Sequence, residues 1–189
     1  MVAAFDIMLD TAGTTSTPGT STIISAITPA PQLRFKRADD ALINTANPNV
    51  IPDAGITYSR WKSLYLKCTI APDVNVSAVY IYSDGSAPTG IDIKVGNETP
   101  THTALLTTGY DVSSTNDSPM TNHASITAVT TLYNFTSGST KTVSISEAGN
   151  IIDAINETSD YVVLQMEVGP TASPGDLADE TITWEYDET

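Results

Sequence analysis

The sequence is poor in several residue types, and each shortage excludes a class of protein. Its 189 residues include one cysteine, Cys68, which excludes an intramolecular disulfide and a metal cluster built from cysteines. Only eight residues are Lys or Arg, against 22 Asp or Glu, and the net charge is −14. Nucleic acids and anionic membrane surfaces bind clustered cations, so we expect neither as a direct partner.

Long hydrophobic runs are also missing. No stretch approaches the roughly 18 apolar residues that a transmembrane helix needs. The first ten residues contain two Asp and no base, unlike the basic start of a secretory signal peptide. These features predict a chain that is made and folded in the cytoplasm.

Patterns typical of catalysis are absent as well. The two histidines, His102 and His123, lie in polar stretches with no neighbouring nucleophile and acid that would suggest a triad. We therefore predict no enzymatic activity, no cofactor and no catalytic metal. Calcium remains an alternative, because a Gly-containing turn and the segment after Pro174–Gly175 supply carboxylates of the kind this ion prefers. These carboxylates are Asp84, Asp176, Asp179 and Glu180.

Serine and threonine are abundant, with 18 and 29 copies that make up a quarter of the chain. Ser competes with the helix backbone for hydrogen bonds, and the β-branched Thr is stiff at χ1, so this composition disfavours helices. The apolar residues recur in short runs, many of them alternating, as strands require. Cys68 is in phase with Leu64, Leu66 and Ile70, which predicts a buried thiol on a strand.

Eight to ten short strands at intervals of about 8–15 residues are expected, separated by Pro, Gly and Asn turns. This spacing is typical of an all-β antiparallel sandwich, either immunoglobulin-like or jelly-roll. The clearest candidates lie at 57–70, 74–82, 91–95, 126–135, 142–146, 161–168 and 181–186, with weaker ones at 33–36 and 104–106. The segment 150–157 could be a helical turn or a strand.

The first 32 residues are expected to be an extended arm, and residues 33–189 the sandwich domain. Residues 3–10 alternate with Phe5, Ile7 and Leu9 on one side, which predicts a short strand with one apolar face. A Thr/Gly/Pro-rich stretch and a Pro-rich hinge follow. We expect this arm to pair with an exposed sheet edge of a neighbouring copy and to bury the three apolar side chains there.

Two further features could serve recognition. Trp61 and Tyr65 could form a surface that stacks on sugar rings, although aromatic side chains also pack across strands without any ligand. Charge is also segregated. Six of the eight bases lie within residues 34–67, whereas residues 142–189 hold eleven acids and no base. This separation would suit head-to-tail contact between copies, or it could only solvate the surface.

The strand-turn pattern of the chain resembles that of known assembly proteins. Residues 161–168, 171–175 and 181–186 resemble the last hairpin of an immunoglobulin-like sandwich, and residues 61–66 and 82–85 fit the same arrangement. Over residues 56–186 the chain is similar in style to β-sandwich virion proteins, such as the capsid decoration proteins of tailed phages. This resemblance implies a structural subunit that coats a larger particle.

The sequence therefore predicts a non-catalytic subunit that self-assembles or coats a particle, with a virion assembled in the host cytoplasm as the first interpretation. Its partners would be other copies of itself and a capsid or fibre lattice. Two alternatives stay open: an extracellular fibre or pilus subunit joined by donor strands, and a carbohydrate- or receptor-binding module.

Overall fold

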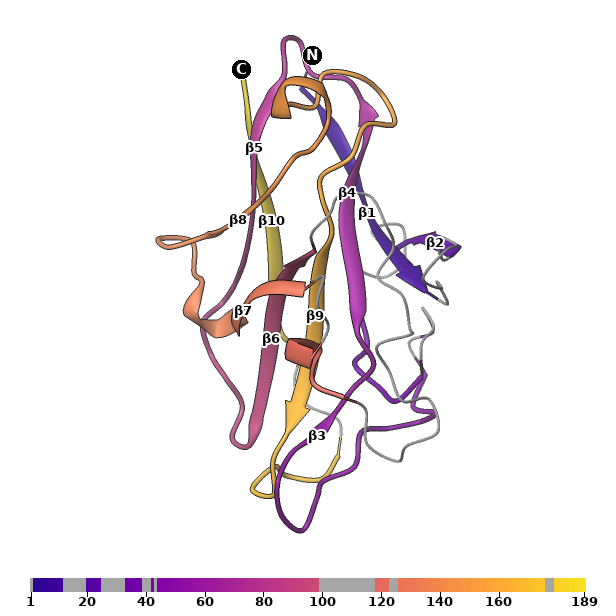
Figure 1. Ribbon diagram of the computed structural model, residues 1–189, viewed down its shortest axis with the longest axis vertical. Helices are drawn as coiled ribbons and strands as arrows, with labels where there is room; N and C mark the ends of the chain where they lie inside the picture. Colours follow the sequence, from indigo (N-terminus) through magenta and orange to yellow (C-terminus); the bar gives the residue numbers. More distant parts are fainter. Residues whose placement is uncertain are drawn as a thin grey trace.

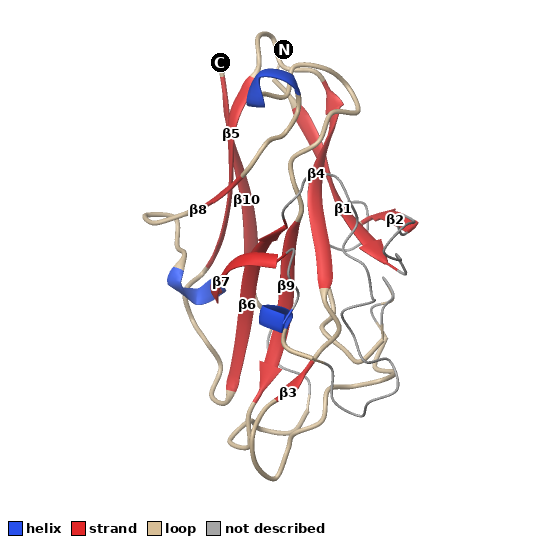
Figure 2. Cartoon of the chain, viewed as in Figure 1, coloured by secondary structure: helices blue, strands red, loops and turns tan. Residues whose placement is uncertain are grey.

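The computed structural model describes residues 2–11, 20–24, 33–38, 42, 44–98, 118–122, 126–175 and 179–189. Within these ranges the chain is all-β, with two antiparallel sheets and only short 3-10 turns, as the composition predicts (Figure 2). The weak strand candidate at 104–106 lies outside them. No helix in the described ranges is long and apolar enough to cross a bilayer.

The larger sheet has seven strands. Six form the order β2-β1-β4-β9-β6-β7, and β3 pairs with β9 beyond the end of β4. The bounds are β1 Ala4–Thr11, β2 Thr20–Ile23, β3 Thr57–Tyr58, β4 Lys62–Ile70, β6 Ile91–Glu98, β7 Ile126–Thr131 and β9 Val162–Val168.

The smaller sheet has the order β10-β5-β8, with β5 Val76–Ser83, β8 Lys141–Val143 and β10 Ile182–Glu188. Short 3-10 turns lie at η2 Met120–Asn122, η3 Leu132–Asn134 and η4 Ala148–Asn150. The undecided segment 150–157 is a series of turns with one isolated bridge, between Ile152 and Val76.

One hydrophobic core joins the two sheets. Strands β4, β6 and β9 contribute residues such as Leu64, Val95 and Leu164 from the larger sheet, and β5 contributes Val79 and Ile81 from the smaller one. All five side chains are almost completely buried. The alternation along each strand therefore directs one apolar face from each sheet into a shared interior, which is the arrangement of a sandwich.

The predicted strand at 57–70 is divided into β3 and β4 by residues 59–61. Ser59 is buried, and its hydroxyl accepts a hydrogen bond from the backbone N–H of Met166 at 2.9 Å. Trp61 turns to the outer face of the large sheet, where it packs with Met120, Ile126 and Val163. This second, smaller core fixes the chain at the point where the strand is interrupted.

The edge strand β7 contains a bulge where the pairing with β6 shifts between Val95 and Asn97. Ala128 has a φ of 52°, an uncommon conformation for a residue with a Cβ. Opposite the bulge, a Cβ added to Gly96 would lie 2.5 Å from the Ile126 side chain, so only glycine fits there. Bulges twist an edge strand away from regular pairing and so protect it from unwanted association.

Gly90 is needed for two independent reasons. Its φ is +72°, and a Cβ there would lie 2.3 Å from the backbone nitrogen of Ala172. Its carbonyl accepts the Gly169 N–H at 2.8 Å, which ties the loop before β6 to the loop after β9. We expect Gly90→Ala to lower the free energy of unfolding by at least about 2 kcal/mol, because it combines backbone strain with overpacking.

Chemical denaturation would measure this change. Gly138→Ala is the matched control, because a Cβ at Gly138 meets nothing within 4 Å, and it should change stability by less than about 0.5 kcal/mol. Equal effects of the two substitutions would contradict the packing at Gly90.

Candidate functional site

The N-terminal strand is the candidate assembly element, and the structure places it inside the sheet of its own chain (Figure 1). It pairs antiparallel with β4 from Ala4 to Asp10. Phe5, Ile7 and Leu9 lie opposite residues of β4 that face the shared core. Leu9 is 1 % exposed, and the other two side chains are partly buried against the same core.

Contacts beyond the strand pairing also hold the start of β1. The Phe5 and Tyr186 rings lie 4.7 Å apart between centroids, and the Tyr186 hydroxyl donates to the Ala3 carbonyl at 2.8 Å. The Ala3 N–H donates to the Glu188 carboxylate at 3.0 Å. The start of β1, which was expected to leave the domain as part of an arm over residues 1–32, is therefore bonded to both sheets of its own chain.

The outer side of β1 carries a polar network in which Asp10, Tyr65 and Tyr161 are buried and Ser21 is exposed. Asp10 accepts a hydrogen bond from the Tyr161 hydroxyl at 2.7 Å and another from the Ser21 hydroxyl of β2. The Tyr65 hydroxyl donates to Ser21 at 3.1 Å. Burial raises the pKa of Tyr65, the bond to Ser21 lowers it, and the nearby Asp10 charge raises it. The network links the N-terminal hairpin to β4 and to the start of β9.

Trp61 and Tyr65 lie in the interior and do not form an exposed pair. Trp61 is 3 % exposed, in the small core on the outer face of the large sheet, and Tyr65 is 8 % exposed. Tyr65 packs edge-on against Tyr161 at 4.8 Å and next to Met8. A ring buried to this degree cannot stack on a sugar unless its covering residues move, so cross-strand packing accounts for both residues.

Gln165 is a buried polar residue that sequence reasoning did not identify. It is fully buried, and its amide donates to the carbonyls of Ser59 at 3.0 Å and Ser118 at 2.9 Å. Its oxygen accepts the Met120 N–H at 2.8 Å. Three good hydrogen bonds satisfy most of the bonding capacity of this side chain and hold segment 118–122 over Trp61. The polar composition of that segment gave no signal of this role.

A charged cluster on the same outer face was also not predicted. The Lys94 ammonium lies 2.6 Å from Asp92 and 3.6 Å from Glu167, and Thr131 donates to Asp92 at 2.7 Å. Burial raises the pKa of Glu167, and the positive charge of Lys94 lowers it. For Lys94, burial lowers the pKa, but the bond to Asp92 and the Glu167 charge outweigh it and the pKa is raised. This is a structural ion cluster that joins β6, β7 and β9.

The structure brings together two of the four carboxylates considered for calcium. Asp84 follows β5 directly, Glu180 precedes β10, and Ser83 and Ile182 pair between them. Burial raises the pKa of Glu180, as do the charge of Asp84 and a hydrogen bond between the two side chains. Asp179 is exposed. Among the described residues, no three potential ligands gather as a metal site would require.

Several residues from the sequence analysis lie outside the described ranges, namely His102, His123 and Asp176. Cys68 is described, and the expectation for it is confirmed: its thiol is buried in β4. Burial raises the pKa of the Cys68 thiol, and the charge of Glu157 adds to this shift. The reactive thiolate form is therefore disfavoured.

Comparison of the chain with protein-family models, with curated proteins and with solved structures gave no match.

The Asp84–Glu180 contact predicts a pH-dependent contribution to stability. Because the pKa of Glu180 is raised on folding, its contribution is favourable below the ordinary glutamate pKa and is lost as the pH rises through the raised value. We expect Glu180→Gln to raise the unfolding free energy at pH 7 by about 0.5 kcal/mol, a figure reduced for solvent screening.

Urea titrations at pH 7 and pH 4 would measure this difference, which should shrink at the lower pH. Glu185→Gln changes an exposed carboxylate of β10, the strand that follows Glu180, and serves as the control. A lower unfolding midpoint for Glu180→Gln at pH 7 would contradict the contact.

Proposed function

We propose that this chain is a non-catalytic structural subunit that assembles with copies of itself, as a capsid-associated protein of a virion. The observation that supports this proposal is the position of β1, which pairs with β4 and covers one side of the shared core. Phe5, Ile7 and Leu9 fill the open side of the core next to β4, and a neighbouring copy could supply the same three side chains and the same backbone hydrogen bonds.

Exchange of β1 would leave the core intact, because every contact would be made again between chains. In the exchanged strand, Phe5, Ile7 and Leu9 would still lie opposite residues 68, 66 and 64 of β4. Phe5 would still contact Tyr186. Exchange of an identical element between protomers is a low-cost route to association, since it creates few new contacts. The arm predicted from the sequence is then the element that links copies.

The virion assignment has support from composition. The chain is rich in Ser and Thr and poor in Lys, as expected of an exposed shell. The place beside β4 that β1 occupies could equally accept a donor strand, which is the alternative of a fibre subunit. Trp61 and Tyr65 give no support to a carbohydrate-binding module, because both are interior.

A disulfide trap would test strand exchange. Asp6 of β1 and Lys67 of β4 are directly opposed, and opposed Cα atoms in a sheet lie about 4.5–5.5 Å apart, within disulfide range. The variant carries Asp6→Cys, Lys67→Cys and Cys68→Ala, and is refolded and oxidised at low and at high concentration. We expect intrachain disulfides at low concentration and a ladder of linked chains on a non-reducing gel at high concentration.

The matched control places Tyr80→Cys opposite Thr142→Cys between β5 and β8, in the same Cys68→Ala background. These strands are not exchanged, so this pair should stay within one chain at every concentration. Assembly that proceeds with only intrachain bonds at positions 6 and 67 would overturn strand exchange. A chain that stays monomeric at every concentration, by electron microscopy and sedimentation, would overturn the subunit role itself.

A further inference from the structure

Lys141 is a buried lysine whose amine has no polar partner. It lies on β8 opposite Ile81 of β5 and is 7 % exposed. Lys141 and Val143 are buried, whereas Thr142 between them is exposed, so Lys141 is on the inner face of β8. Its Nζ atom lies over the Phe135 ring, 5.5 Å from the centroid. Within the part of the chain that the structure describes, no carboxylate pairs with this ammonium and no oxygen accepts a hydrogen bond from it.

Three other lysines have the acceptor that Lys141 lacks. The Nζ atom of Lys36 lies 3.2 Å from a side-chain amide oxygen, that of Lys62 lies 3.3 Å from a backbone carbonyl, and that of Lys94 lies 2.6 Å from a carboxylate. Such acceptors stabilise the charged form of an amine, and an aromatic ring is a weaker partner than a carboxylate. For Lys141, burial therefore predominates, and it lowers the pKa of the amine. A larger fraction of this amine is neutral, and hence nucleophilic, near pH 7 than of an ordinary lysine.

The amine of Lys141 can be reached from solution. β8 is an edge strand of the smaller sheet, so in the described chain no further strand pairs along its outer side (Figure 1). The described polar atoms that lack both a hydrogen bond and solvent contact include the Tyr133 hydroxyl but not the Nζ atom of Lys141. The nitrogen therefore keeps contact with solvent while its stem is buried, an arrangement that long lysine side chains often adopt.

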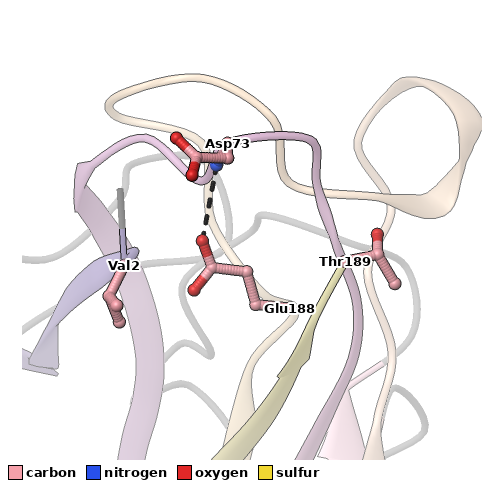
Figure 3. A pocket seen from close by; sticks show the side chains of 4 residues that line it. All are labelled: Val2, Asp73, Glu188 and Thr189. Atoms are coloured by element: carbon pink, nitrogen blue, oxygen red, sulfur yellow. Dashed lines mark hydrogen bonds between the residues drawn. The ribbon is translucent and has the colours of Figure 1, made fainter.

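Two other places in the described chain offer no comparable nucleophile. The thiol of Cys68 is buried, and its pKa is raised, so its reactive form is disfavoured. Figure 3 shows a shallow hollow of about 360 Å³ near the two termini, lined by Val2, Asp73, Glu188 and Thr189. These four lining residues include no amine or thiol side chain. Covalent chemistry with a small molecule is therefore best placed at Lys141.

We propose that Lys141 is a covalent attachment site for small apolar aldehydes, which it binds as a Schiff base. A desolvated lysine is a known kind of nucleophile for carbonyl carbon. The neutral amine attacks the carbonyl carbon, one N–H proton passes to the carbonyl oxygen, and the second N–H proton leaves with that oxygen as water. The neutral imine that remains suits a site without a counter-ion, whereas a carbamate formed with CO₂ would place an unpaired negative charge there. The inference goes beyond the proposed subunit role and does not depend on it.

Reductive trapping on the 189-residue chain tests this site. The chain is incubated with benzaldehyde and sodium cyanoborohydride between pH 6 and pH 10, and the benzyl adducts are located by peptide mass spectrometry, which also separates the reaction of the α-amino group. At pH 7 we expect Lys141 to be labelled at least roughly tenfold faster than Lys94, because the pKa of Lys141 is lowered and that of Lys94 is raised. Access alone would favour Lys94, whose side chain is 25 % exposed. The ratio should fall as the pH rises and Lys94 loses its proton.

Two substitutions at Phe135 form a matched pair. Phe135→Glu places a carboxylate beside the amine and should reduce labelling of Lys141 to the level of Lys94, whereas Phe135→Leu keeps the site apolar and should retain the fast reaction. Thermal unfolding would verify that both variants are folded, and the pH profile of the original chain decides the question if one is not. Labelling of Lys141 no faster than that of Lys94 at pH 7 would overturn the inference, as would fast labelling that persists in a folded Phe135→Glu variant. Fast labelling of Lys141 in a chain that stays monomeric would support this site and overturn only the subunit role.

Discussion

The pairing of β1 with β4 is the interaction on which the rest of this structure depends. It covers the open side of the core beside Leu64 and Leu66, and it brings Phe5 against Tyr186 of the opposite sheet. On the outer face it places Asp10 between Ser21 and Tyr161. Without this strand, apolar side chains and a sheet edge would be open to solvent, and such edges associate readily with other chains.

Further polar contacts hold together the described part of the chain away from β1. Its polar groups hold strands and segments together: the buried Gln165 holds the segment over Trp61, and the half-buried Lys94 joins two carboxylates on neighbouring strands. Its buried thiol is held in the form that reacts poorly. Large apolar side chains that remain exposed include Val2, Val74 and Ile155.

The alternation of apolar and polar residues in the sequence predicted where strands form and which side chains are buried. Alternation in residues such as Ile91, Ile93 and Val95 predicted strands that the structure confirms, and the phase of Cys68 predicted its burial. The sequence did not reveal which chain β1 pairs with, because the same apolar face suits a strand of its own sheet or of a neighbour. It also did not reveal that Trp61 is covered, because the covering segment around Met120 is polar and short.

Long-range contacts were the least predictable part. Asp84 and Glu180 were grouped from composition alone, and the pairing of Ser83 with Ile182 is what brings them together. The two lysines Lys36 and Lys62 were counted as surface charge, yet both are buried: Lys62 donates to the Ala38 carbonyl, and Lys36 donates to the Asn44 side chain. Burial of a charge depends on such tertiary contacts, which no local pattern encodes.

Hydrogen exchange of the isolated 189-residue chain tests the central claim most directly, since backbone amides report whether a strand belongs to a cooperative core. The account predicts that the amides of β1 exchange as slowly as those of β4 and β9. Amides of β1 that exchange like a free peptide, while β4 and β9 stay protected, would contradict it.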